Sequence, residues 1–440
     1  MFTVRRLSST VPRSLSKQTR GNATLSVASS ASQVAPLLVD ASSTDPAESK
    51  TQGRRTRNTT KRPSISLENP RKWNRALPQG VMPAYDLALQ YLHQDSHNLK
   101  DEVNDLQKAI DEKEALYSTL QKKLTEHGQT SVEKEMQTLD EELEKLLEKL
   151  NIIQVQSEIN LPHVRWSVNN AMADMSNVTH RHLLEQKWRK DGNLDLLMER
   201  IHQMGVVPDV LPVIRPSIDL HVAARTSPSD FHKTGKVQGQ VEPGVFLKSK
   251  QTLVPPKLYA TVFHTDVRLY TMLLIDPDVP HPEAETFTTF LHWMKPNIPL
   301  SATSSNLTNL NDHTSYIPPH PQRGTPYHRY VCLLLPQPPL RASGYTLAAA
   351  SRAGTEPTSA HLDIPALNTA DRLGFDMRAF AERWDLDGAN GGGAHMWREI
   401  WDEDVSAIYK DFLEQEEPRY GQPLKFDPYA QMKQQKKYIL

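Results

Sequence analysis

The chain has 440 residues, of which 38% are hydrophobic and 23% are charged, and its formal net charge is −1. Its mean hydropathy of −0.56 is low for one compact globule, and no stretch approaches the roughly 20 uninterrupted apolar residues needed to cross a bilayer. The single cysteine, Cys332, excludes an intrachain disulfide and a multi-cysteine zinc site. We therefore expect one sizeable domain with solvated extensions, or two or three smaller domains, and no transmembrane segment.

The first 45 residues have the composition of a mitochondrial transit peptide. Residues 1–39 contain five lysine or arginine residues and no acid, and serine, threonine and alanine fill the gaps. This combination is typical of mitochondrial targeting, whereas a secretory signal needs a continuous apolar core. We predict a transit peptide or disordered leader over residues 1–45 and a location in the mitochondrial matrix. The alternative is a basic tail without a targeting role.

Residues 46–95 are predicted to form an irregular basic arm. Between Thr51 and Arg75 the only acid is Glu68. Such a density of positive charge repels itself unless an anion neutralises it, and nucleic-acid phosphate does so while releasing counterions. The candidate contacts are Arg54, Arg55, Arg57, Lys61, Arg62, Arg71, Lys72 and Arg75. Trp73 adds a ring that can stack on an unpaired base. The alternative is a solvated linker.

Two heptad helices are predicted within residues 96–155. Apolar residues recur in steps of four and three from Leu99 to Leu124 and again from Val132 to Ile153, with acids and lysines between them. The stretch "EHGQTS" interrupts the pattern, and Thr130 with Glu133 fits a capping box for the second helix. We expect an antiparallel hairpin; the alternative is a helix packed on a partner or a homodimeric coil.

The remaining chain changes from helical to strand-like. Residues 156–203 are predicted to be a helical linker, and residues 204–415 an antiparallel β domain with short C-terminal helices, followed by a tail at 416–440. Residues 300–315 and 338–360 read as long loops, and "GANGGGAH" (388–395) as a flexible loop. The expected strands lie at 257–263, 268–275, 286–294 and 328–335, and a short amphipathic helix is expected at 376–384.

Three polar residues on separate predicted strands are candidates for one site: Asp276, His292 and His328. Two histidines and a carboxylate can hold a non-haem iron or supply a general acid and base. They can also line a pocket for an anion, or simply form a buried polar network that fixes a strand end. The prolines of "DPDVP" are expected to end the strand and hold the acid at the rim of the domain.

The motifs "YTMLLIDPDVP", "LHWMKPNIP" and "YIPPHPQRGTPYHRYVCLLLPQ" closely resemble the phosphatidylethanolamine-binding-protein family, over roughly residues 204–405. "VVPDVL" (206–211) resembles the opening strand of that family. The resemblance implies that Asp276, His292 and His328 form the wall of a small anion pocket and not a metal site. His320, Gln322 and Pro326 replace glycine or proline of the family pattern. Because they add bulk and remove backbone freedom, we expect a vestigial pocket.

The whole layout resembles the mitochondrial large-subunit ribosomal proteins that carry such a domain, in their fungal form. That resemblance implies a structural role near the central protuberance, with rRNA and neighbouring ribosomal proteins as partners and with no DNA, cofactor or catalytic residue. The sequence contains no HExxH, GxGxxG, GK[ST] or GxSxG motif, so we expect no enzyme. The alternatives are a free module that binds a phosphate or lipid head group or inhibits another protein, and a metal-dependent enzyme.

Overall fold

The computed structural model describes residues 71–127, 130–340 and 344–421. The chain divides into two compact units, Met1–Lys72 and Trp73–Leu440, and the fold below is that of the second unit. The predicted transit peptide, most of the basic arm and the end of the tail lie outside the described residues. Among the described residues, no helix is both long and apolar enough to cross a membrane.

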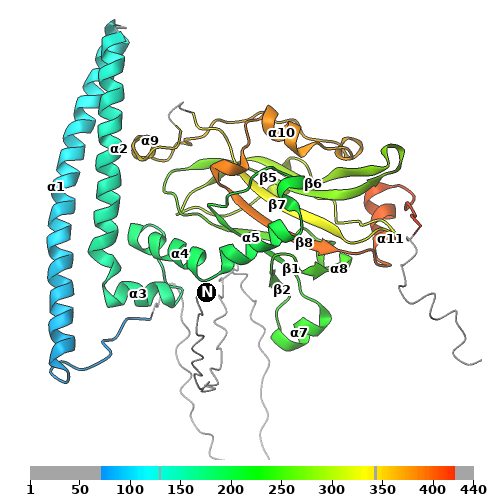
Figure 1. Cartoon of the computed structure of the whole chain (residues 1–440), viewed down its shortest axis with the longest axis horizontal. Coiled ribbons are helices and arrows are strands. Elements are labelled where there is room, and N and C mark those ends of the chain that lie inside the picture. The colour runs from blue at the N-terminus through cyan, green and yellow to red at the C-terminus, as the bar shows by residue number, and fades with distance from the viewer. Residues whose placement is uncertain (1–70, 128–129, 341–343, 422–440) are drawn as a thin grey trace, which may run out of the picture. The chain divides into compact units, whose positions relative to one another are not determined.

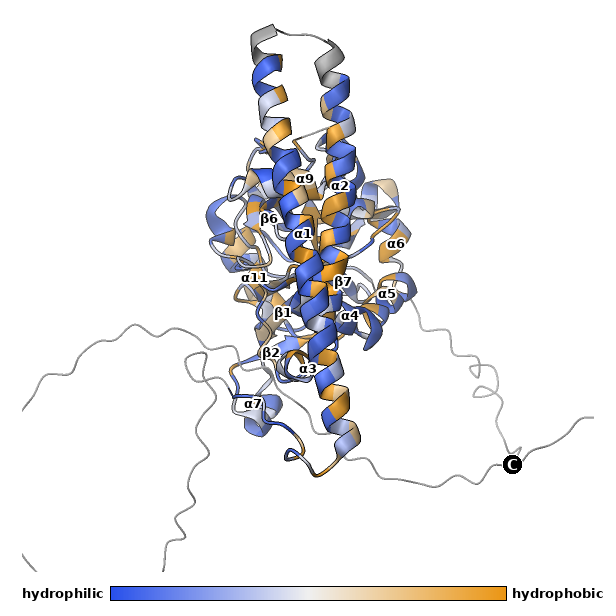
Figure 2. Ribbon diagram, turned by 90° about the vertical axis from the view of Figure 1, so that its left-hand side faces the viewer, coloured by the Kyte–Doolittle hydropathy of each residue, from blue (hydrophilic) through white to orange (hydrophobic). Residues whose placement is uncertain are grey.

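The predicted hairpin is formed by α1 (Pro83–His127) and α2 (Thr130–Ile159), which pack against each other along their heptad seams. Ile110 and Leu143 are 1% and 0% exposed, and apolar stretches of the two helices lie side by side in Figure 2. The seam is therefore covered within the chain, as the hairpin interpretation predicts. Because the side chains of residues 125–133 are outside the described set, the capping box at Thr130 stays a prediction.

Helix α1 begins at Pro83, so residues 83–95 are helical and not part of an irregular arm. Proline suits the first turn of a helix, where its missing N–H has no partner to lose. Asp86 lies in that first turn, and its carboxylate accepts a hydrogen bond from Gly80 N at 2.8 Å. Good helix formers follow in the first turns, in the run from Leu87 to Gln90.

Residues 156–203 are largely helical, as predicted, and the helices are α3 (Pro162–Asn169), α4 (Val178–Lys190) and α5 (Asn193–Gln203). Trp188 of α4 is 4% exposed and packs on Phe263 with ring centroids 5.7 Å apart. The prediction of an opening strand at 206–211 is wrong. A short helix, α6 (Val206–Asp209), follows the left-handed residue Gly205 instead.

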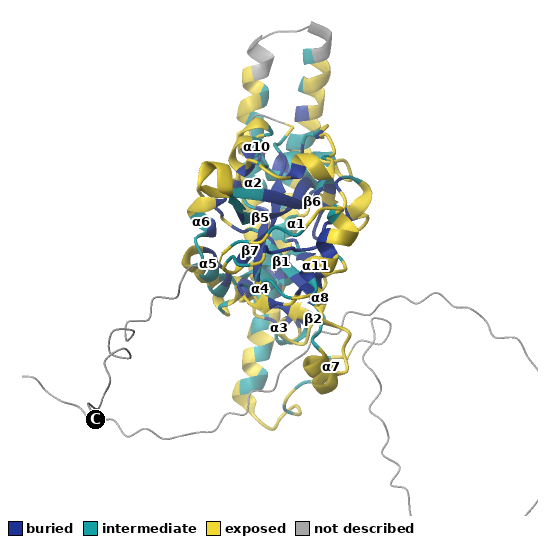
Figure 3. Ribbon diagram, turned by 90° about the vertical axis from the view of Figure 1, so that its right-hand side faces the viewer, coloured by how far each residue is buried: buried dark blue, intermediate teal, exposed yellow. Residues whose placement is uncertain are grey.

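The β domain contains two sheets, ordered β2-β1-β4 and β3-β8-β7-β5-β6. All strand pairs are antiparallel except β3 with β8, so the fold is close to the predicted antiparallel domain. The main core lies between the sheets, and the central strands are buried in Figure 3. The strands are β1 (Asp219–Arg225), β2 (Gln238–Val241), β3 (Phe246–Leu247), β4 (Lys257–Thr261), β5 (Arg268–His281), β6 (Thr286–Leu300), β7 (His328–Pro336) and β8 (Gly393–Glu399). Short helices α7 (Pro228–Thr234), α8 (Ser249–Thr252), α10 (Met377–Arg383) and α11 (Val405–Ile408) flank them, and α10 matches the helix expected at 376–384.

Strand β5 does not stop at the "DPDVP" corner, as the sequence led us to expect, but continues to His281. The pairing with β6 shifts register between Asp276 and Val279. This bulge lets Pro277, which has no N–H, pass without breaking the ladder. Asp276 is consequently held inside the domain and not at its rim.

Two further elements contradict the predicted loops. Strand β8 begins at Gly393, inside the segment read as a flexible glycine-rich loop. Helix α9 (Leu347–Ala353) lies in the expected loop 338–360 and packs against α2. The Glu144 carboxylate of α2 accepts hydrogen bonds from Leu347 N at 2.8 Å and Ala348 N at 2.9 Å. Helix α9 also has local signals that the loop prediction overlooked, since Thr346 Oγ1 accepts a hydrogen bond from Ala349 N at 3.2 Å and alanines follow.

Candidate functional site

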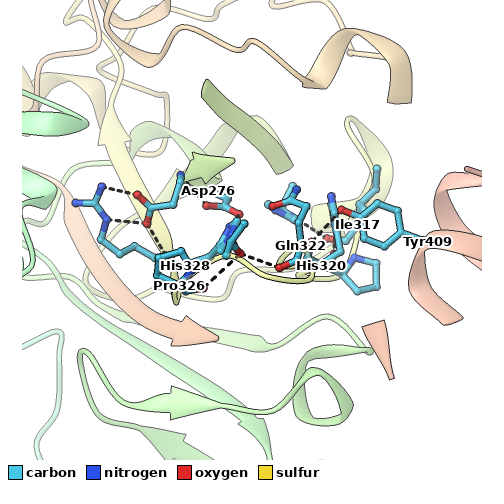
Figure 4. A network of polar contacts seen from close by, with 12 residues as sticks. Asp276, Ile317, His320, Gln322, Pro326, His328 and Tyr409 are labelled. Atoms are coloured by element: carbon cyan, nitrogen blue, oxygen red, sulfur yellow. Dashed lines mark hydrogen bonds and ion pairs between the residues drawn. The ribbon is translucent and has the colours of Figure 1, made fainter. Parts of the chain in front are cut away.

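The three candidate residues Asp276, His292 and His328 are brought together by β5, β6 and β7. Their exposed fractions are 2%, 0% and 1%. Figure 4 shows the polar network running from Asp276 through His328 to the loop that carries His320 and Gln322. The family resemblance therefore selected residues that do meet, but they meet in the interior.

His328 joins the acid to the neighbouring loop. Its Nδ1 donates to Asp276 Oδ2 at 2.7 Å, and its Nε2 lies 2.9 Å from Thr325 Oγ1, which itself donates to Gln322 O at 2.8 Å. Burial lowers the pKa of His328, but the nearby carboxylate of Asp276 outweighs burial and the net pKa is raised. Both ring nitrogens are thus placed to donate, and the charge of the imidazolium is compensated within the chain.

His292 and His320 form the neutral side of the site. His292 Nδ1 donates to Ile317 O at 2.9 Å, which leaves the buried Nε2 without a hydrogen-bond partner. Burial, together with the neighbouring His320, holds the pKa of His292 well below its usual range. Burial also lowers the pKa of His320, to about 4. The His320 ring lies 5.0 Å from the His292 ring and 4.8 Å from that of Phe290, between centroids. The side chain that replaces glycine of the family pattern is therefore packed into the site.

The C-terminal segment covers the other side of His320. Tyr409, in the π-helix η5 (Tyr409–Leu413), is 4% exposed and places its ring 5.2 Å from that of His320, with its hydroxyl donating to His320 O at 3.3 Å. Gly324 has φ +94°, and a Cβ atom there would lie 1.9 Å from Tyr420 O. Tyr409 and Tyr420 thus lie close against the loop, and solvent reaches none of the three candidate side chains appreciably.

Glu399 belongs to the same site, although no sequence motif pointed to it. Strand β8 pairs His328 with Glu399, which is 0% exposed. Trp397 Nε1 donates to Glu399 Oε1 at 2.9 Å, and burial raises the pKa of Glu399 to about 8. The Glu399 carboxyl group is therefore mostly protonated at neutral pH. A buried strand in "AHMWRE" was the available signal, but the preceding glycines masked it.

The arrangement is suited to bracing strands and not to exchanging ligands. Among the described residues, no group of three or more His, Cys, Asp or Glu side chains is placed to hold a metal ion. An acid–base pair that is almost completely buried cannot transfer a proton to a substrate without opening the domain.

Comparison with known proteins identifies the family of the β domain and a relative of a longer part of the chain. A family model described as phosphatidylethanolamine-binding protein matches residues 229–382. Large ribosomal subunit protein mL38 of Schizosaccharomyces pombe is 30% identical over 258 residues, which cover 58% of this chain and 73% of that protein. The chain belongs to the mL38 family. The similarity to the S. pombe protein extends over more residues than the family model matches, so it includes sequence outside that match.

The chain is also similar to two other proteins. Protein MOTHER of FT and TFL1 homolog 2 of Oryza sativa subsp. japonica is 34% identical over 113 residues, covering 26% of this chain and 51% of that protein. A solved structure, the phosphatidylethanolamine-binding protein from Plasmodium vivax, is 16% identical, has a TM-score of 0.30, and covers 47% of this chain and 97% of that chain.

Only three of the predicted nucleic-acid contacts lie in the described part of this mL38-family chain. Arg71 and Lys72 are exposed. Arg75 is partly buried, forms an ion pair with Asp86, and lies over the ring of Tyr85 at 5.3 Å. Arg75 is therefore already partly neutralised. Arg54, Arg55, Arg57, Lys61 and Arg62 lie outside the described residues.

Proposed function

We propose that the chain is a structural protein of the mitochondrial large ribosomal subunit that binds rRNA through its basic arm and neighbouring ribosomal proteins through its folded part. Membership of the mL38 family is the observation that carries this proposal. The family supports the expected mitochondrial location and a ribosomal protein, not an enzyme. The finer assignments below are our own inference.

The arm is the proposed rRNA contact. Its eight cations lie within residues 54–75 with a single acid among them, and phosphate is the anion that such a segment neutralises most effectively. Arg71 and Lys72 are exposed and available for this role. Arg75 is expected to contribute least, because Asp86 already pairs with it.

The hairpin is the proposed protein contact, in a position near the central protuberance. At its N-terminal end, Leu87 and Tyr91 are 65% and 72% exposed and lie one helical turn apart. Large apolar side chains presented together on a helix are typical of a surface that another protein covers. This arrangement supports docking by the hairpin.

The family anion pocket is proposed to be vestigial in this chain. His320 and Gln322 are 5% and 4% exposed and occupy the space beside Asp276, His292 and His328, while Tyr409 covers them. The site therefore supports bracing of strands in preference to the alternative of a free head-group-binding module.

Sedimentation of the tagged full-length chain tests the proposal. In a gradient of mitochondrial lysate, the chain is expected to migrate with the large subunit. Replacement of the eight arm cations by glutamine is expected to weaken binding of the chain to the large subunit by more than about tenfold. The reason is that each lost phosphate contact no longer releases counterions, and the loss is seen as the salt concentration of the gradient is raised. Migration of the unaltered chain as a free protein would contradict the proposal.

The matched control replaces eight exposed lysines of the folded part by glutamine: Lys108, Lys123, Lys187, Lys190, Lys233, Lys236, Lys248 and Lys257. This variant removes the same charge from a different place. It is expected to stay with the large subunit at salt concentrations that release the arm variant.

A further inference from the structure

A groove lies where the helical part meets the β domain. It encloses about 450 Å³ and is lined by α2, α4 and two segments of the β domain, residues 263–268 and 345–350. Figure 1 shows α4 and α9 next to the domain-facing side of α2. The groove is separate from the buried site around Asp276, since the two share no lining residue.

One face of each helix is turned toward the groove. On α2 this face consists of Ile152, Val155, Gln156 and Ile159, and on α4 of Val178, Arg181, His182 and Glu185. Both sets follow the spacing i, i+3, i+4, i+7 of a single helical face. Ile152 is 57% exposed, and Phe263 and Leu347 add apolar surface opposite. The groove therefore has apolar surface on both sides that none of the described residues covers.

Arg181 is the one groove-lining arginine without an ion pair in the described part of the chain. It is 6% exposed, and Nη1 donates to Met175 O at 2.7 Å and to Ser176 O at 2.8 Å. The other groove-lining arginine, Arg268, is paired with Asp266 at 2.8 Å. The charge of Asp174 acts on Arg181, but burial outweighs it and lowers the pKa of Arg181. A further carboxylate at hydrogen-bonding distance would compensate the buried cation more completely.

We infer that this groove binds a segment of a neighbouring ribosomal protein, with an apolar side chain against Ile152 and Leu347 and an aspartate or glutamate directed at Arg181. The inference rests on the proposed function and names a partner surface within it. RNA fits less well, because nucleic-acid interfaces are strongly positive, whereas this lining combines apolar side chains with the acids Glu185 and Asp266.

Site-directed crosslinking in the full chain tests the inference. A photo-reactive phenylalanine analogue replaces Gln156, an exposed groove residue, and large subunits are isolated on a gradient after irradiation. We expect a crosslink to one ribosomal protein, at a peptide that contains an acidic residue next to an apolar one. The same analogue at Glu148, exposed on α2 but outside the groove, is the control.

Two variants sharpen the test. Ile152→Asp places a carboxylate at the groove mouth, and Arg181→Met removes the cation while keeping similar bulk. Each is expected to lower the crosslink from position 156 at least about tenfold, the equivalent of about 1.4 kcal/mol. Lys187→Met, on α4 outside the groove, is expected to leave the yield unchanged.

The outcomes separate the two proposals. A crosslink to rRNA, to this chain itself, or to nothing while the chain sediments with the large subunit would overturn the groove inference alone. A yield that is insensitive to both Ile152→Asp and Arg181→Met would overturn it as well. Absence of the chain from the large subunit would overturn the proposed function, and the groove inference with it.

Discussion

The buried site around Asp276 and the groove around Arg181 differ in how completely their buried charges are compensated. In the buried site, the acid and His328 compensate each other at 2.7 Å and are covered by the chain's own His320 and Tyr409. In the groove, Arg181 is almost as deeply buried but forms no ion pair with a carboxylate of the described residues. Asp174 compensates its charge only in part, and open space lies beside it. A motif that marks a ligand site in a family can therefore become a buried network that holds strands together. The groove between the helices and the β domain provides a different, open surface.

The largest expected effect is the loss of stability when the internal pair is broken. Asp276→Ala leaves the His328 imidazolium buried without its carboxylate, so the free energy of unfolding should fall by about 3–5 kcal/mol. Urea unfolding of the purified full chain measures it. Asp363→Ala, where the side chain is 97% exposed, should change stability by no more than about 0.5 kcal/mol. A loss below about 1 kcal/mol for Asp276→Ala would mean that water, and not packed protein, surrounds the pair.

A smaller effect is expected in the pH dependence of stability. Glu399 has a pKa of about 8 in the folded chain, so between its ordinary value and that pH the folded state holds a proton that the unfolded state releases. Stability contributed by this group therefore falls as pH rises through that window. Glu399→Gln removes the fall and should make the variant more stable than the unaltered chain at pH 8, by on the order of 3 kcal/mol, with little difference at pH 5.

Two buried histidines, His292 and His320, change stability with pH in the opposite direction to Glu399 and serve as the internal check. Burial lowers the pKa values of His292 and His320, so the unfolded state binds more protons between about pH 4 and 6.5. Stability should fall as the pH drops through that range in both proteins. Urea midpoints from pH 5 to 8.5 measure both limbs, and Glu416→Gln at an exposed position is the control. Parallel profiles for Glu399→Gln and the unaltered chain above pH 6.5 would show that Glu399 is not buried as a neutral acid.

The smallest expected effect is weak anion binding after the site is reopened. The unaltered chain should show no saturable heat with inorganic phosphate, because His320 and Gln322 fill the site. The double variant His320→Gly with Gln322→Pro restores two of the three altered positions of the family pattern and should bind phosphate with a dissociation constant of about 1 mM. Calorimetry detects this, and a cooperative urea transition confirms that the variant is folded. Saturable binding by the unaltered chain would refute the proposed closure.

The parts of the fold that follow local patterns were predictable from sequence. The heptad steps through Ile110 and Leu143 indicated the hairpin, and the apolar runs that became β5, β6 and β7 indicated the central sheet. Elements that depend on distant partners were not predictable. Strand β8 emerges from a glycine-rich segment because it pairs with β7. Helix α9 had local signals in Thr346 and the alanines after it, but its docking on Glu144, about 200 residues away, was not indicated.

The site divides in the same way. The motif residues Asp276, His292 and His328 were identifiable because their types and order match a family pattern, and the substitutions at His320 and Gln322 indicated altered packing. Asp276 lies inside the β domain and not at its rim because of a bulge in β5. The two prolines of the motif did not indicate this bulge. The contributions of Tyr409 and Glu399 depend on the folded positions of the last helices and β8.

Mapping of RNA-crosslinked peptides in purified mitochondrial large subunits tests the central claim most directly. After ultraviolet irradiation and RNA digestion, mass spectrometry locates the nucleotide-bearing residues of this chain. The account predicts crosslinks within residues 51–75, centred on the arm cations. If the chain is present in the subunit but carries its RNA crosslinks only on the folded part, or carries none, the arm is not the anchor and the account is contradicted.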